Sequence, residues 1–282
     1  MRVELLLALA LALGACASEP RPVDPPRLKS ALEAESDGAK RFQRGDFKVA
    51  ERRFTEAAKL FASIDDDAGS TRNRLHLARV RLAQGGAEAA LDLLAALPAA
   101  DAAAVEVLLL KGQGLLALGR AEDATRILAS AAQACPDPCA AGASLAILQG
   151  RAALARGDAA ASLGQAERAL RLLRDRNEPH ETGNAWRLLA AARLMRGDPA
   201  ALAAAEAALE IDRRLALPEK IARDWLLIGD IHRQGSAGKA GAALEAAATA
   251  YRRARSVAAA AGLEEISLDA SQSLQAIGME KN

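Results

Sequence analysis

The sequence predicts an all-α fold, a solenoid of stacked helical hairpins, and three observations lead to that prediction. About a quarter of the 282 residues are alanine and only 2% are aromatic, which favours helices over sheets. Between turns, apolar residues recur three and four positions apart, the spacing of an amphipathic helix. The turns themselves recur every 34 to 40 residues, a period typical of a solenoid. An all-β fold is excluded.

The charge balance limits the classes of partner. The 37 basic and 36 acidic residues leave a net charge of +1, so the chain has no global field to hold nucleic acid or an anionic membrane surface. With 51% hydrophobic residues, burial offsets the entropy of ordering, and disorder is expected only near the N-terminus.

The N-terminal segment is typical of a secretory signal. Arg2 precedes an apolar stretch over residues 5–13 that is too short to be a permanent membrane anchor. The run Leu13-Gly14-Ala15-Cys16 resembles the bacterial lipoprotein box, in which the signal is cut before a lipidated cysteine. The resemblance implies that residues 1–15 are removed and that Cys16 becomes the lipid-carrying N-terminus. Ordinary secretion, with Cys16 incidental, is the alternative.

The residues after the lipoprotein box set the expected location. Ala17 follows the cysteine where inner-membrane retention would use aspartate, so the resemblance implies a periplasm-facing protein of the bacterial outer membrane. Residues 16–27 are rich in proline and lack apolar periodicity. We expect them to form an extended tether of roughly 30 Å.

From Leu28 onward, helix, turn and helix alternate in about six hairpins that span residues 28–277. Five turns stand out: Gly45-Asp46, Gly85-Gly86, Gly119-Arg120, Gly157-Asp158 and Gly197-Asp198. Seven residues before each turn glycine stands a small residue: Gly38, Ala78, Gly112, Gly150 and Ala190. Small side chains there let two helices cross closely, and the Asp residues of the turns are expected to cap the following helix.

The hairpins resemble tetratricopeptide (TPR) repeats. The first hairpin matches best, with Gly38, Gly45-Asp46-Phe47, Ala50, Phe54 and Ala57. The runs 186–190 and 225–229 reproduce the first-helix pattern with its preferred tryptophan. The resemblance implies a right-handed αα-superhelix with a concave groove, lined mainly by first helices, that binds peptides or helices of partner proteins.

The sixth hairpin carries an insertion over residues 235–241, and an amphipathic stretch from Leu263 to Ile277 follows it. We expect that stretch to be a capping helix over the last apolar face, with residues 278–282 as a tail. All four phenylalanines lie in the first hairpin: Phe42, Phe47, Phe54 and Phe61. They, with Trp186 and Trp225, are expected in the core, and an aromatic binding cluster is the alternative for the phenylalanines.

Two further cysteines, Cys135 and Cys139, flank Pro136-Asp137-Pro138. With Cys16 lipidated in an oxidising envelope, this even remainder favours a structural disulfide. Free thiols and thiol chemistry stay open, although the spacing differs from that of a redox CxxC pair. No further Cys or His lies near enough in sequence to complete a zinc site.

The sequence offers no catalytic or cofactor motif. The three histidines lie in different hairpins, without a companion at the spacing of a metal or nucleophile site. Gly238-Lys239 superficially resembles a phosphate loop, but Ala240 replaces the magnesium-binding hydroxyl. We therefore expect no enzyme, no metal and no cofactor.

The TPR resemblance assigns a set of groove residues, mapped from the turn glycines and from Gly229. They are Arg72, Arg79, Arg151, Asn184, Arg187, Arg223 and Arg233. Their excess of positive charge favours an acidic segment or a C-terminal carboxylate as the ligand. The alternative is that these arginines are scattered, solvated helix residues.

These inferences lead to one favoured function and two alternatives. The favoured one is a membrane-anchored scaffold that binds envelope proteins, in envelope, pilus or secretion-complex assembly or as an adaptor for cell-wall enzymes. A self-associating structural lipoprotein, and an enzyme or small-molecule carrier, are the alternatives.

Overall fold

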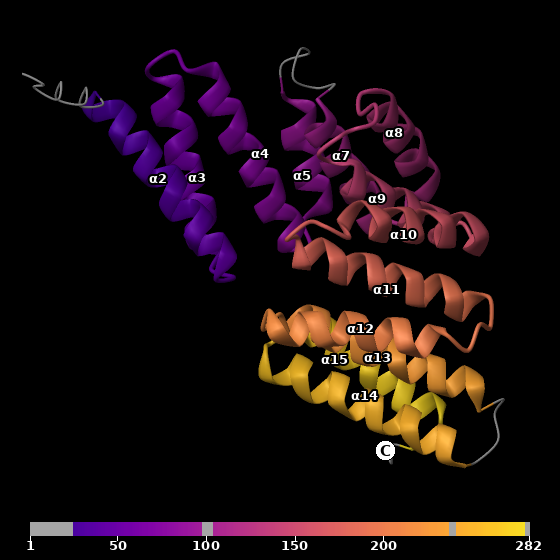
Figure 1. Cartoon of the computed structure of the whole chain (residues 1–282). Helices are drawn as coiled ribbons and strands as arrows, with labels where there is room; N and C mark the ends of the chain where they lie inside the picture. Colours follow the sequence, from indigo (N-terminus) through magenta and orange to yellow (C-terminus); the bar gives the residue numbers. More distant parts are fainter. Residues whose placement is uncertain (1–24, 98–103, 237–240, 280–282) are drawn as a thin grey trace, which may run out of the picture. The chain divides into compact units, whose positions relative to one another are not determined.

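The computed structural model describes residues 25–97, 104–236 and 241–279 (Figure 1). Within those ranges the chain forms 13 helices and no strand, which confirms the all-α prediction. The helices are α2 (Pro26–Gln43), α3 (Phe47–Ala62), α4 (Asp67–Ala83), α5 (Ala87–Ala95), α7 (Val105–Ala117), α8 (Ala121–Gln133), α9 (Gly142–Ala155), α10 (Ala159–Leu173), α11 (Pro179–Met195), α12 (Ala201–Arg214), α13 (Pro218–Gly235), α14 (Ala242–Ala260) and α15 (Glu264–Ala276). The predicted signal, Cys16 and most of the tether lie outside the described residues.

The chain divides within α4 into two compact units. The first ends at Asn73 and the second begins at Arg74. The first unit holds the hairpin of α2 and α3 with the start of α4. The second holds the rest of α4 and all later helices, and Figure 1 shows α11, α12 and α13 side by side in chain order.

The five predicted turns are built alike. Each turn glycine has a left-handed backbone, with φ between 67° at Gly197 and 80° at Gly157, a region that glycine enters without steric cost. The next residue donates its backbone N–H to the carbonyl five positions earlier, as Asp46 does to Arg41 at 2.9 Å. This is the Schellman ending of a helix.

The predicted capping by turn aspartates holds only in part. Asp158 accepts a 2.9 Å hydrogen bond from the backbone N–H of Ala161, as a helix cap does. Asp46 makes no such bond, and its carboxylate faces Arg41 at 3.4 Å. The prediction is wrong for Asp46 because a nearby guanidinium competes for the carboxylate.

Small residues at the predicted crossings lie against large side chains of a neighbouring helix. A Cβ at Gly38 would lie 2.8 Å from the Phe54 ring, and one at Gly112 would lie 2.7 Å from a methyl of Leu128. Both distances are shorter than a van der Waals contact, so any larger residue would push the two helices apart.

The core is aliphatic and rich in alanine, and its largest cluster joins α10 to α14. Phe54 and Phe61 are buried in the first unit, while Phe42 and Phe47 stay half-buried with their ring centres 5.5 Å apart. The tryptophans are half-buried and pack against the large cluster. The expected core positions are thus confirmed in full only for Phe54 and Phe61.

A helix lies at each end of the repeat region, α15 at the C-terminal end and α2 at the N-terminal end. Helix α15 lies on α14 and buries Ile266 and Leu274, while Leu268 is 59% exposed, so the predicted capping helix is confirmed. At the other end α2 begins at Pro26, so Pro26 and Arg27 are helical where we expected an extended tether. Proline fits the first helical position because its missing N–H would have no partner there.

Candidate functional site

First helices of successive hairpins pack side by side in the second unit. Helix α9 contacts both α7 and α11, and α11 contacts α13. Residues at equivalent positions of these helices therefore lie on one continuous wall. We call the surface formed by α7, α9, α11 and α13 the groove.

Arg151, in α9, is a predicted groove residue whose positive charge has no ion-pair partner among the described residues. Its side chain is exposed, and it has no hydrogen bond or ion pair with any residue that the structure describes. The surrounding protein nevertheless removes much of its water. That desolvation lowers the pKa of the guanidinium, and the positive charges of Arg223 and Arg187 lower it further. An anion placed here would relieve both effects.

Arg187 has a different role from the one predicted. It is 19% exposed and binds two carboxylates that are fully buried, Asp212 of α12 and Asp224 of α13. Its Nε donates to Asp224 at 2.6 Å, and its Nη2 donates to Asp212. Asn184 accepts a further 3.2 Å hydrogen bond from Arg187. These contacts tie three helices together, so Arg187 is structural.

Asp212 and Asp224 are both paired with Arg187, so two buried acids face one positive charge, and this arrangement affects the pKa of Asp224. Burial raises the pKa of Asp224 to about 7, the bond and charge of Arg187 oppose that rise, and the charge of Asp212 adds to it. One oxygen on each acid, Oδ1 of Asp212 and Oδ2 of Asp224, has no hydrogen-bond partner. A proton on Asp224, donated to Asp212, would satisfy both oxygens.

Lys220 of α13 is a groove residue that the sequence reasoning missed. It is half-buried, and the described residues give it no ion pair or hydrogen bond. Desolvation lowers the pKa of its amino group and the charge of Arg187 lowers it further, while the charges of Asp212, Glu181 and Glu219 oppose this shift. Lys220 and Arg151 are therefore two cations that could accept an external carboxylate.

The remaining predicted residues mostly bind acids of the chain itself. Arg72 belongs to the first unit, and its guanidinium lies over the Phe61 ring. Its Nε and Nη2 donate hydrogen bonds to the carboxylate of Glu35 at 2.5 and 2.9 Å, and these bonds raise the pKa of Arg72. Arg79 pairs with Glu106 at 2.5 Å. Both arginines are thus paired with acids of the chain itself, and their part in a basic wall that binds a partner stays a prediction.

Two predicted residues of α13 differ in how available they are. Arg233 donates to the Tyr251 hydroxyl at 3.3 Å and faces Asp230 at 3.4 Å, contacts that raise its pKa. Arg223 has an exposed ion pair with Glu219 at 3.1 Å, with both side chains more than half exposed. Such a pair contributes little and exchanges readily, so Arg223 remains open to a ligand.

Cys135 and Cys139 are joined in a disulfide between α8 and α9, with their Cα atoms 5.5 Å apart. Cys135 is buried in the cluster that includes Leu128 and Leu145. Mass spectrometry of unreduced protein should find the two cysteines linked, and Cys139→Ser should lower the free energy of unfolding by about 2 kcal/mol. Two thiols alkylated without reduction would contradict the disulfide.

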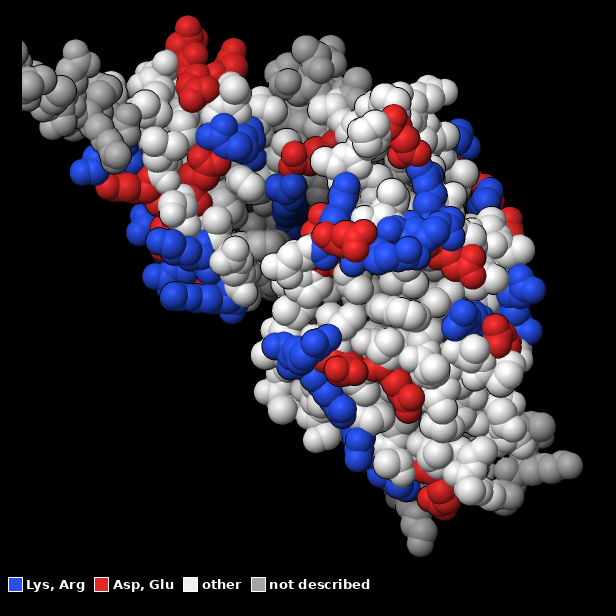
Figure 2. Space-filling view, in the orientation of Figure 1, with Lys and Arg blue, Asp and Glu red and all other residues white. Residues whose placement is uncertain are grey.

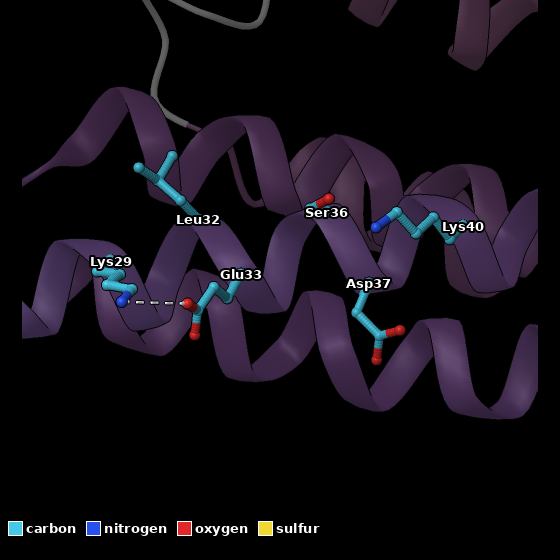
Figure 3. Close-up of a pocket in the computed structure, with 6 residues that line it drawn as sticks. All are labelled: Lys29, Leu32, Glu33, Ser36, Asp37 and Lys40. Carbon is cyan, nitrogen blue, oxygen red and sulfur yellow. Dashed lines mark ion pairs between the residues drawn. The ribbon is translucent and has the colours of Figure 1, made fainter.

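Other surface features offer weaker candidates. A depression on the first unit lies along one side of α2, between the side chains of Lys29, Leu32 and Asp37, and Figure 3 shows its polar residues spread along that single helix. No group of three metal-binding side chains occurs among the described residues. In the same ranges no helix is both long and apolar enough to cross a bilayer.

Comparison with known proteins supports the repeat assignment. A tetratricopeptide repeat model matches residues 48–114. No curated protein matches the chain. The Cut9–Hcn1 hetero-tetramer of APC/C is similar with a TM-score of 0.69 at 15% identity, covering 88% of this chain and 43% of that one. The apo form of RapI is similar with a TM-score of 0.54 at 13% identity, and the match covers 88% of this chain and 70% of the RapI chain.

At these identities the solved structures show the fold alone. The chain is a TPR-like αα-superhelical solenoid, and it spans less than half the length of the Cut9–Hcn1 chain that it matches. Solenoids of this kind stack their repeats into extended concave surfaces that such proteins use for binding.

Proposed function

We propose that the protein is a lipid-anchored scaffold of the bacterial cell envelope that holds an acidic segment of a partner protein in its groove. The observation that carries the groove assignment is Arg151, an exposed arginine that is partly desolvated by the protein, has two other cations nearby and has no carboxylate partner among the described residues. A carboxylate side chain or a C-terminal carboxylate of the partner supplies the missing charge through a bidentate contact.

Neighbouring residues extend this contact along the groove. Arg223 and Lys220 lie on α13, one hairpin beyond Arg187, and Arg223 is close enough to perturb Arg151 electrostatically. A segment with two or more acidic residues could therefore engage all three cations at once. Each contact alone is worth about 1 kcal/mol or less, and several together set specificity and association rate.

A double charge reversal tests the groove. Arg151→Glu with Arg223→Glu should weaken binding of the partner at least tenfold, because two attractions become repulsions, while helix content stays unchanged. The partner is identified by quantitative mass spectrometry after capture on the wild-type protein, and binding of its acidic segment as a synthetic peptide is measured by calorimetry.

The matched control is Arg44→Glu with Arg52→Glu. These arginines are exposed and have no ion pair among the described residues, and the change in net charge is the same. Wild-type affinity in the groove variant, or equal loss in both variants, would contradict the groove assignment.

The lipid anchor rests on the sequence around Cys16, which lies outside the described residues. Cys16→Ser should move the protein from the membrane fraction to the soluble periplasmic fraction, because no acyl chains would then hold it to the bilayer. Cell fractionation with immunoblotting measures this, with Cys139→Ser as the cysteine control. Unchanged membrane association of the Cys16 variant would refute lipid anchoring.

A further inference from the structure

Two arginines, one on α12 and one on α14, lie over a tryptophan of α13, and none of the three residues belongs to the predicted groove set. We propose that Arg213, Trp225 and Arg253, here called the Arg–Trp clamp, form a second binding surface that holds a pair of carboxylates on an acidic helix of a partner protein. This surface uses none of the residues assigned to the groove, so it extends the proposed function without depending on it.

The geometry of the clamp comes from α12, α13 and α14. The guanidinium carbon of Arg213 lies 5.0 Å from the centre of the Trp225 ring, and that of Arg253 lies 4.6 Å from it. Because both distances are measured to one point, the two guanidinium groups lie no more than 9.6 Å apart. The indole is half-buried against the large core cluster, which fixes its position.

The charge of the clamp is uncompensated. Arg213 and Arg253 are exposed, and neither has a carboxylate partner among the described residues. The same holds for their neighbours Arg214 and Arg252. Figure 2 shows Lys and Arg side chains over α12 and α14 on the face in view, with Asp and Glu side chains beside them. Most other arginines named above are instead paired within the chain.

Stacking prepares these guanidinium groups for a ligand. Each guanidinium carbon lies over the indole ring within cation–π distance, and this contact restricts the rotamers of the arginine. Because both arginines are exposed, their N–H groups are accessible to a carboxylate, which a guanidinium can bind in bidentate geometry. A side chain already held in place loses less entropy on binding, so the clamp offers stronger contacts than two free surface arginines would.

The spacing and surroundings favour an acidic helix as the ligand. Carboxylates one helical turn apart, at positions i and i+4, lie at Cβ distances of about 6 Å and reach two groups within 9.6 Å through their flexible side chains. Glu206 and Glu210 are exposed on the same helix as Arg213. An anionic bilayer would be repelled by both glutamates, because it covers the whole surface. Two carboxylates on a partner helix can contact the arginines without lying against Glu206 or Glu210, so a protein ligand fits better than a lipid surface.

The test uses the full chain and a synthetic helical peptide with glutamate at every fourth position. Its matched control peptide carries glutamine there. Trp186→Phe leaves Trp225 as the only tryptophan, so its fluorescence reports binding at the clamp directly, and calorimetry on the unmodified chain gives an independent affinity. We expect a saturable fluorescence change with the glutamate peptide and at least tenfold weaker binding of the glutamine peptide.

Variants then distinguish the clamp from the groove. Arg213→Gln with Arg253→Gln should lower the affinity for the glutamate peptide at least tenfold in the fluorescence assay. Arg44→Gln with Arg52→Gln should change that affinity less than twofold. Arg151→Glu with Arg223→Glu should leave the Trp225 signal intact, so failure of the groove and failure of the clamp are separable. Unchanged affinity in the clamp variant, or saturable binding to phosphatidylglycerol vesicles without binding to the peptide, would overturn the proposal.

Discussion

Replacing Arg187 with alanine should lower the free energy of unfolding by about 3–5 kcal/mol, because it removes the one cation that forms ion pairs with these two buried carboxylates among the described residues. Asp212 and Asp224 are both fully buried, so water cannot replace the guanidinium. The loss is measured as a shift of the urea unfolding midpoint by circular dichroism. A change below about 1 kcal/mol would show that the cluster contributes no more than an exposed ion pair.

Two comparisons isolate the cause of that loss. Arg223→Ala, which removes an exposed ion pair one hairpin away, should cost at most about 1 kcal/mol. In a background with both Asp212→Asn and Asp224→Asn, Arg187→Ala should cost much less than in the wild type, because no buried charge is left unpaired. Equal costs in the two backgrounds would assign the effect to packing of the arginine stem.

Asp224→Asn should stabilise the protein at pH 8 by a few kcal/mol and flatten its dependence on pH. The folded-state pKa of Asp224, about 7, lies above its value in the unfolded chain, so folding takes up a proton. The favourable contribution is present below about pH 4 and is lost as the pH rises to about 7. Asparagine keeps an acceptor for Arg187 and gains a donor toward Asp212 without that proton.

Urea unfolding of the wild type and the variant between pH 5 and pH 8 measures this difference. The gap in stability should grow with pH, because only the wild type must ionise a buried acid. Asp269→Asn, at an exposed site of α15, should leave the slope unchanged. Parallel pH profiles for Asp224→Asn and the wild type, or a less stable variant at pH 8, would show that Asp224 is ionised without penalty.

Much of the fold follows from local signals in the sequence. The turn glycine at 45 and its four equivalents can be recognised without tertiary information, because a left-handed residue after a helix almost requires glycine. The small residues at 38 and 112 follow from the same repeat register, and the structure shows the ring and methyl groups that need the space. Periodicity likewise locates the capping helix within one residue at each end.

The charges of the groove could not be assigned in the same way. Repeat position places Arg187 on the correct helix, but its partners lie 25 and 37 residues further along the chain. The signal that would have revealed them is an acid on an apolar stripe: Asp212 continues the spacing of Ala205 and Ala208, both fully buried. Arg79 shows the same limitation, since the acid that binds it belongs to the next first helix.

The central claim, that the groove binds an acidic segment through Arg151, is tested most directly by photo-cross-linking in intact cells. Gln113 is exposed on α7 and follows Gly112 as Arg151 follows Gly150, so it occupies the equivalent position on the neighbouring first helix. A photoreactive residue at 113 should give a discrete adduct whose cross-linked peptide is acidic, and Arg151→Glu should abolish that adduct. An adduct that persists in the Arg151 variant, or a cross-linked peptide without acidic residues, would contradict the claim.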